Sequence, residues 1–210
     1  MNKGLIFVIS GPAGSGKGTV VNLIRNRNPR VGLSVSATTR DPRPGEKDGV
    51  SYFFMTKEKF ASLLEAGEIL EHTEYCSNFY GTLRSEVVRI TEEGRDVILE
   101  IEVDGAMQVK RLIGDGVVTI MLAAPGAAEL ERRLRGRGTE SEESIVKRLT
   151  RAKEELATAP RYDYFVTNET DRAEECADLV MKIMAAEHSR SERSAEYIGE
   201  YISELDGIIK

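Results

Sequence analysis

The sequence has few of the residues that build disulfide frameworks or metal clusters. Its 210 residues include only two cysteines, Cys76 and Cys176, which lie far apart and lack the spacing of a metal site. We therefore expect two separate thiols in a reducing compartment rather than a disulfide. Internal repeats and low-complexity tracts are also absent. The length suits one compact globular unit with room for small inserted subdomains.

An excess of positive charge is missing too. Acidic residues outnumber basic ones by 35 to 29, which gives a formal net charge of −6. So acidic a chain is a poor candidate for sequence-independent DNA binding, and we expect no nucleic-acid partner. No apolar run is long enough to span a bilayer, and the first one, residues 5–10, lacks a small-residue cleavage site. We expect a cytoplasmic protein with no signal peptide and no membrane partner.

Short apolar runs alternate with helical patterns along most of the chain. Runs typical of strands buried in a parallel sheet occupy residues 5–10, 96–103, 117–123 and 162–168. Helical spacing occurs after Lys17, at 105–113, at 126–135 and at 142–159. This alternation predicts an α/β fold with a central parallel sheet.

Residues 34–82 interrupt that alternation. They are rich in turn residues and hold short β-like runs around one helical segment, "TKEKFASLLEAG". Thr56 is the expected N-cap of this helix and Gly67 its stop. We expect a small mixed α+β insertion between early and central strands of the sheet.

The stretch "GPAGSGKGT", residues 11–19, is a glycine-rich loop between a predicted strand and a predicted helix. That context is typical of the P-loop, in which backbone N–H groups and the helix N-terminus bind phosphate oxygens. Lys17 would add positive charge at the terminal phosphates. The loop indicates a nucleoside triphosphate but leaves the acceptor open. Its predicted binding residues are Gly11, Pro12, Ala13, Gly14, Ser15, Gly16, Lys17, Gly18 and Thr19.

Two groups of cationic side chains suit a second phosphate and a transferring phosphoryl group. In "TTRDPRPGE", prolines stiffen the loop around Arg40 and Arg43, and the hydroxyls of Tyr52 and Tyr80 could donate to the same anion. The alternative is ordinary surface arginines and core tyrosines. Residues 132–151 hold further arginines on a glycine-hinged segment that could close over a triphosphate. We expect solvated ion pairs for Arg132, Arg135 and Arg151, and composition leaves both roles open for Arg133, Arg137 and Arg148.

Two carboxylates stand out in the central apolar run. In "VILEIEVDG", Glu100 and Glu102 are two residues apart, so in a strand both would point to one face. Buried carboxylates are costly unless they meet a cation or hydrogen-bond donors. Ligands are expected at the carboxyl end of such a strand, and a magnesium-side carboxylate is the natural role.

The chain resembles the guanylate kinases, ATP-dependent GMP kinases, in their bacterial form, over about residues 4–186. The resemblance depends on the segments "SVSATTRDPRPGEKDGVSYFF", "EILEHTEYCSNFYGT", "VILEIEVDGA", "RLRGRGTESEESIVKRL" and "YDYFVTNET" in this order and spacing. It implies reversible transfer of the γ-phosphoryl group of ATP to GMP, giving ADP and GDP. Mg²⁺ is the implied cofactor, with ATP as co-substrate.

The resemblance also implies roles for particular residues. GMP would be bound by Ser36, Arg40, Arg43, Tyr52, Glu71, Tyr80, Thr82 and Glu102. Of these, Ser36, Glu71 and Thr82 would read the guanine edge, and Asn168 would lie near the adenine of ATP. Lys17, Arg40, Arg133, Arg137 and Arg148 would be the catalytic residues, and Glu100 would serve magnesium through water.

The family's architecture implies a P-loop NTPase-like three-layer fold in several parts. Residues 1–33, 83–132 and 152–186 would form the P-loop core, 34–82 a GMP-binding subdomain and 133–151 a helical lid. The remainder, 187–210, contains an amphipathic helical stripe with an acidic opposite face. This helix would either pack on its own body or form a homo-oligomer contact.

One position departs from the family pattern. Gly18 follows Lys17, so a hydroxyl arrives only at Thr19, and "GKGT" is the ending associated with adenylate and cytidylate kinases. Thr19 is therefore a second candidate metal ligand beside Glu100. An AMP, CMP or UMP kinase is one alternative function. A non-catalytic guanylate-kinase-like module that binds proteins is another, although such modules lack a working P-loop.

Overall fold

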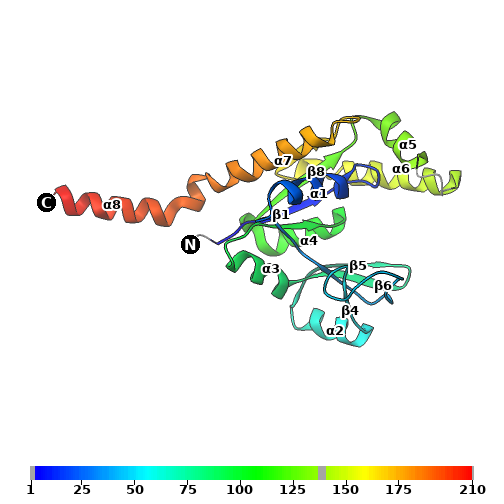
Figure 1. Ribbon diagram of the computed structural model, residues 1–210, viewed down its shortest axis with the longest axis horizontal. Coiled ribbons are helices and arrows are strands. Elements are labelled where there is room, and N and C mark those ends of the chain that lie inside the picture. Colours follow the sequence, from blue (N-terminus) through cyan, green and yellow to red (C-terminus); the bar gives the residue numbers. More distant parts are fainter. Residues whose placement is uncertain (1–2, 137–140, 210) are drawn as a thin grey trace.

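The computed structural model describes residues 3–136 and 141–209. Helices cover both faces of a five-stranded parallel sheet with the strand order β2–β7–β1–β8–β9 (Figure 1). The expected three-layer α/β fold is confirmed. The strands are β1 (Ile6–Ser10), β2 (Gly32–Leu33), β7 (Val97–Glu100), β8 (Val117–Ala123) and β9 (Tyr164–Thr167).

The central strand β1 is apolar at every core position because both of its faces are covered. Phe7 and Ile9 pack into one cluster with residues of α1 (Lys17–Arg27) and α7 (Ala173–His188). Val8 packs into the other cluster with α3 (Arg84–Glu92) and α4 (Val103–Ile113). All three side chains are fully buried. Residues that alternate in a strand point to opposite faces, so a sheet between two helical layers needs an unbroken apolar run.

Residues after β2 form a second, smaller sheet beside the carboxyl ends of the large one. Its order is β4–β3–β6–β5, with antiparallel pairing except between β3 and β4. The helix within it begins and ends as predicted: Thr56 Oγ1 accepts from the N–H of Lys59 at 3.2 Å, and Gly67 has φ +72°. The elements are β3 (Ser36–Thr38), β4 (Phe53–Phe54), α2 (Lys57–Glu65), β5 (Ile69–Tyr75) and β6 (Asn78–Leu83).

The predicted strand 96–103 is too long, so Glu100 and Glu102 do not share a strand face. Strand β7 ends at Glu100, and Glu102 is the N-cap residue of α4, with its carbonyl accepting from the N–H of Ala106 at 3.0 Å. The apolar pattern continues past the strand because Ile101 and Val103 stay in the same core. A short apolar run does not distinguish a strand from the first turn of a buried helix.

The remaining helices lie at opposite ends of the molecule (Figure 1). At one end, α5 (Ala127–Arg135) and α6 (Glu142–Leu156) share a small core with Ala13 of the P-loop. At the other, α8 (Ala195–Ile209) extends far beyond the body, and none of its described residues is buried. Of the two alternatives left open for this stripe, the structure does not show packing on its own body. Single 3₁₀ turns occupy Gly114–Gly116, Ala159–Arg161 and Ser191–Ser194.

Candidate active site

The glycine-rich loop joins β1 to α1 with three residues in left-handed or related backbone conformations. Gly11, Gly14 and Gly16 have φ values of +143°, +89° and +90°. A Cβ on Gly11 would lie 2.0 Å from the carbonyl oxygen of Leu122, so a side chain would break the contact with β8. The amine of Lys17 folds back over the loop, bonded to the carbonyl of Gly11 and 3.4 Å from that of Pro12. A cation is therefore already held above the phosphate cradle.

Asn168, at the end of β9, holds the loop from beneath. Its side-chain Nδ2 donates to the backbone carbonyl of Ser15 at 2.9 Å, and its backbone carbonyl accepts from Arg133 Nη2 at 2.9 Å. Only 4% of the residue is exposed. Gly16 allows this contact, since a Cβ there would lie 2.3 Å from Asn168 Nδ2. Asn168 thus connects the loop to β9 and to helix α5.

The arginines of α5 and α6 separate into two groups. Arg132 and Arg135 form ion pairs with Glu129, Glu131 and Glu142 on exposed helix faces, which confirms the expectation for these two. Arg133 points inward to Asn168 and is 18% exposed. Arg148 lies half-buried on α6, and Arg137 lies outside the described residues.

Arg151 forms the helix-surface pair expected for it and makes one further contact that was not expected. It bonds Glu155 at 2.9 Å on its own helix and also reaches Glu102 Oε2 at 3.4 Å across the site. An arginine of α6 therefore touches a carboxylate predicted to bind GMP. The i, i+4 spacing to Glu155 was visible in the sequence, but the contact to Glu102 depends on how α6 packs beside α4.

Glu100 lies directly beside Gly18. A Cβ on Gly18 would be 3.4 Å from Glu100 Oε1, so no side chain separates this carboxylate from the start of α1. Glu100 is open to solvent at the strand end, yet the surrounding protein displaces water and raises its pKa. The charge of Glu102 raises that pKa further, and Lys17 opposes the shift. Thr19 is exposed and lies roughly 100° further round α1, since an α-helix has 3.6 residues per turn.

Arg40, Tyr52 and Tyr80 come together on the small sheet. The Arg40 guanidinium lies 5.4 Å from the centre of the Tyr52 ring, and the two tyrosine rings meet edge-on at 6.0 Å. Tyr80 also interacts electrostatically with Arg40. Sequence reasoning missed Glu46, whose carboxylate forms a two-pronged ion pair with Arg40. Its signal was an acidic residue three positions after Arg43, within "TTRDPRPGE". Arg43 is exposed on the same loop.

Glu71 is a buried carboxylate between the small sheet and α4. It is 5% exposed, and Thr82 Oγ1 donates to its Oε1 at 2.7 Å. Ser36 pairs with Thr82 across β3 and β6, so all three predicted guanine-reading residues adjoin. A Cβ on Gly105 would lie 2.4 Å from Glu71 Oε2, so α4 approaches the carboxylate as closely as glycine allows. Burial raises the pKa of Glu71.

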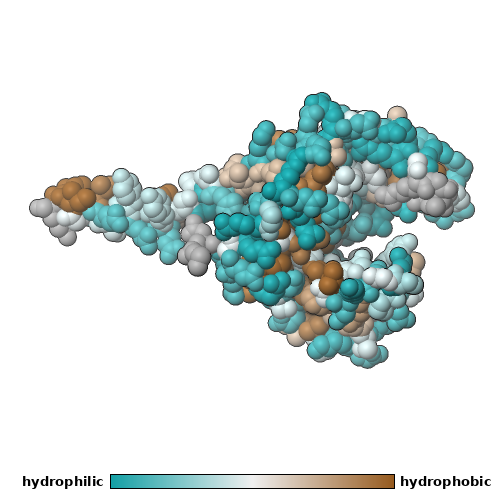
Figure 2. Space-filling view, viewed as in Figure 1, coloured by the Kyte–Doolittle hydropathy of each residue, from teal (hydrophilic) through white to brown (hydrophobic). Residues whose placement is uncertain are grey.

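These groups belong to two parts of the molecule that a notch separates. Figure 2 shows the surface deeply notched between the α5–α6 helices and the small sheet. The P-loop, Glu100 and Arg133 belong to the side of the large sheet, and the Arg40 and Glu71 groups belong to the small sheet. Among residues 3–136 and 141–209, no three His, Cys, Asp or Glu side chains cluster as a metal site, and no helix is long and apolar enough to cross a membrane.

Comparison with known proteins agrees with this geometry. The family model described as guanylate kinase matches residues 3–187. The chain belongs to the guanylate kinase family. It is a nucleoside monophosphate kinase, a transferase that phosphorylates GMP with ATP.

Individual relatives extend the match beyond the family model. Guanylate kinase of Shouchella clausii is 49% identical over 91% of this chain and 92% of that protein. Guanylate kinase of Clostridioides difficile is 44% identical over 97% and 98%, so its alignment includes most of the C-terminal segment. The crystal structure of guanylate kinase from Anaplasma phagocytophilum superposes with a TM-score of 0.70 at 35% identity, covering 91% of this chain and 90% of that one.

Proposed function

We propose that phosphoryl transfer takes place across the notch, with ATP on the P-loop and GMP on the small sheet. The observation that carries the choice of acceptor is the buried Glu71 carboxylate held by Thr82. Guanine presents N1–H and N2–H₂ donors on one edge, and a carboxylate accepts from both. Adenine has neither donor there. Ser36 adjoins this pair and would complete the reading of the base.

The acceptor phosphate would be bound by Arg40, Arg43 and the two tyrosine hydroxyls, Tyr52 and Tyr80. Guanidinium groups match phosphate oxygens in pairs, and phenol hydroxyls add single donors. Glu102 would lie at the GMP as well, which its contact to Arg151 of the lid supports. The phosphate is already an anion, so no general base is required and no covalent intermediate is needed.

The triphosphate would lie on the backbone amides of residues 11–19, with Lys17 on its outer phosphates. Arg133, Arg137 and Arg148 would surround the transferring phosphoryl group, where negative charge spreads over three oxygens in the transition state. Asn168 would lie near the adenine and hold the P-loop in place through its bond to the carbonyl of Ser15. Catalysis is then positioning and charge stabilisation.

Magnesium fits the donors present, because the Glu100 carboxylate adjoins the P-loop at Gly18. Mg²⁺ favours one or two carboxylates together with phosphate oxygens and water, rather than a site made wholly of protein ligands. Glu100 supplies a hard oxygen donor next to Gly18; burial by the surrounding protein raises its pKa, and the charge of Lys17 opposes the rise. We propose Glu100, through water, as the metal-side residue in preference to Thr19. The ion would offset charge on the phosphates.

The functional units follow this division. We assign residues 1–33, 83–132 and 152–186 to the P-loop core, 34–82 to GMP binding and 133–151 to the lid. A cytoplasmic location is supported by the two unpaired thiols, Cys76 and Cys176, which suit a reducing compartment.

A panel of four acceptors tests the proposed chemistry. With ATP and magnesium, GMP should give a diphosphate with kcat/KM at least about a hundredfold above those for AMP, CMP and UMP, because a base without the two donors leaves the buried Glu71 carboxylate with Thr82 as its donor and none from the ligand. A coupled ADP-release assay measures all four. Comparable turnover of AMP would overturn the assignment of Glu71, and no turnover of any acceptor would favour a non-catalytic module.

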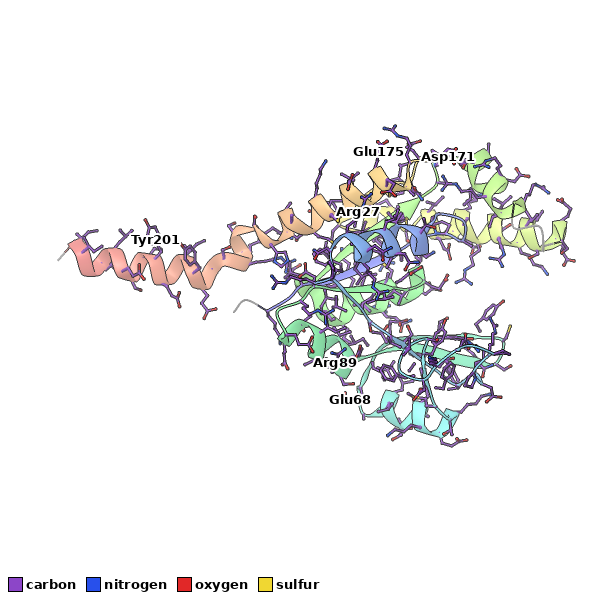
Figure 3. The ribbon with its side chains drawn as sticks, in the orientation of Figure 1. Arg27, Glu68, Arg89, Asp171, Glu175 and Tyr201 are labelled. Atoms are coloured by element: carbon purple, nitrogen blue, oxygen red, sulfur yellow. The ribbon has the colours of Figure 1, made fainter. Side chains whose placement is uncertain are left out.

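We further propose that α8 contacts a second copy of the chain. Its apolar residues are 39–79% exposed, and four of them repeat at the 3,4,3 spacing of a helix–helix seam. Tyr201, one of the four, projects from α8 far from the body of the molecule (Figure 3). The stripe consists of Tyr197, Ile198, Tyr201, Ile202, Leu205, Ile208 and Ile209.

Two observations favour a second copy over other occupants. The acidic face of α8 carries Glu196, Glu200, Glu204 and Asp206. Glu204 borders the seam and the other three lie outside it, so two stripes can meet while these carboxylates stay solvated; an anionic membrane surface would repel them. The base of α8 is also anchored: buried Glu187 accepts from Tyr164 at 2.6 Å and from Arg193 at 3.1 Å. A helix that is already fixed in position loses less conformational entropy when it binds a partner.

Removal of residues 191–210 should halve the particle mass in solution, measured by size-exclusion chromatography with light scattering. Tyr201→Asp should have the same effect, because it places a charge in the seam, and Glu200→Gln, outside the seam, should not. A full-length chain that is monomeric, or a truncated chain with an unchanged assembly, would contradict the proposal.

A further inference from the structure

Glu46 is a charged residue of the acceptor loop to which the mechanism above gives no task. It lies between β3 and β4, with its side chain 22% exposed. Its Oε2 and Oε1 accept from Arg40 Nη1 and Nη2, each at 2.9 Å. Parallel bonds of this kind set the plane of the guanidinium as well as its position.

The same carboxylate also fixes the backbone of the loop. Glu46 Oε2 accepts from the N–H of Arg43 at 2.7 Å. The Arg40 ion pair and this backbone bond, in that order, lower the pKa of Glu46, so the carboxylate is charged at neutral pH. Glu46 therefore fixes both the side chain of Arg40 and the backbone at Arg43.

The hydrogen-bond inventory of Arg40 shows which of its edges is left for a ligand. A guanidinium has five N–H donors. Both Nη1 hydrogens are used, one by Glu46 and one by the carbonyl of Asp41 at 2.6 Å, and one Nη2 hydrogen is used by Glu46. Glu46 and Asp41 leave the Nε hydrogen and the second Nη2 hydrogen, which form the parallel pair on the other edge of the plane; Tyr80 is the further hydrogen-bonding neighbour of this guanidinium.

Aromatic rings keep this edge in place. The guanidinium lies 5.4 Å from the ring centre of Tyr52 and 5.8 Å from that of Phe54, within the range of cation–π contacts. A phosphate that binds the Nε–Nη2 edge would not displace Glu46. The ion pair is then a support for the phosphate site rather than a competitor of the phosphate.

We propose that Glu46 is a positioning residue for GMP, which orients Arg40 so that its Nε–Nη2 edge faces the acceptor phosphate. This inference depends on the proposed phosphate-binding role of Arg40. It concerns the phosphate of GMP and leaves guanine recognition and ATP binding to other residues.

Steady-state kinetics of Glu46→Gln test the proposal. The amide keeps the size of the side chain but offers Arg40 only one acceptor, so the KM for GMP should rise about tenfold, equivalent to about 1.4 kcal/mol. The KM for ATP should stay unchanged. Guanosine, which lacks the phosphate, should inhibit the variant and the wild type with equal Ki, which separates a phosphate effect from unfolding of the small sheet.

Two further variants make the result specific. Glu86→Gln breaks a similar two-pronged pair with Arg89 on α3 and should leave the KM for GMP unchanged; Figure 3 shows Arg89 on this helix. In an Arg40→Ala background, Glu46→Gln should add less than twofold. An unchanged or lower KM for GMP in Glu46→Gln, or full additivity with Arg40→Ala, would overturn the proposal. Absence of GMP turnover in the wild type would instead refute the proposed function itself.

Discussion

Replacing Glu71 with glutamine is expected to lower kcat/KM for GMP by on the order of a thousandfold. The amide cannot accept from two guanine donors at once, and each charge-assisted bond is worth about 1.5–3 kcal/mol. ATP binding should not change, because Glu71 belongs to the small sheet and the P-loop to the large one. Acceptor kinetics and ATP titration together measure the two effects.

The same substitution should stabilise the free protein near neutral pH. Burial raises the pKa of Glu71, so folding favours its protonated form and the wild type loses stability as pH rises through that raised pKa. Glutamine keeps the bond from Thr82 without a buried charge. The gain in Tm of Glu71→Gln should therefore grow from acid to neutral pH.

Glu74→Gln is the matched control for both measurements, because Glu74 is exposed three residues further along β5. It should change neither the GMP kinetics nor the Tm. If Glu71→Gln turned GMP over at the wild-type rate, the carboxylate would have no part in reading guanine. A lower Tm at neutral pH would show that the charge is compensated in the free protein.

Lys17→Ala is expected to reduce kcat by a factor on the order of a thousand or more. The amine is held over the P-loop at the carbonyls of Gly11 and Pro12, and it supplies positive charge where the transferring group becomes most negative. Rapid-quench measurement of GDP formation at saturating ATP and GMP would report this loss. Circular dichroism should show an unchanged fold.

Lys182→Ala removes an exposed lysine of α7 and is the control for loss of charge alone. It should retain full activity. Near-normal GDP formation by Lys17→Ala would refute the role of this loop in transfer. Loss of activity in both variants would indicate a general effect of net charge rather than a local one.

Much of the site could be predicted from the sequence because its signals are local. A P-loop needs a strand, glycines at given positions, a lysine and a helix, and all of these lie within residues 5–27. The cap at Thr56 and the stop at Gly67 are similar cases, since a cap is satisfied by atoms three or four residues away. The segment "SATTRDPR" indicated the guanylate kinase family, and the family implied GMP as the phosphoryl acceptor.

Other features were beyond such reasoning because they depend on packing between distant segments. The strand at 97–100 ends where α4 begins, and the apolar pattern runs through both. Glu46 was visible only as an acidic residue in a loop until its two bonds to Arg40 were seen. The contact between Arg151 and Glu102 depends on the position of α6 relative to the start of α4, which the sequence does not show.

The sequence by itself determined the class of fold, the phosphate loop and the family, because each is carried by residue types at short, regular spacing. The tertiary structure decided the neighbours: Glu100 beside Gly18, Glu71 against Gly105 and an apolar stripe on α8 that its own body leaves uncovered. These are distances between segments far apart in the chain. They arise from how the layers pack, and a hydrophobic pattern shows which face is apolar but not what covers it.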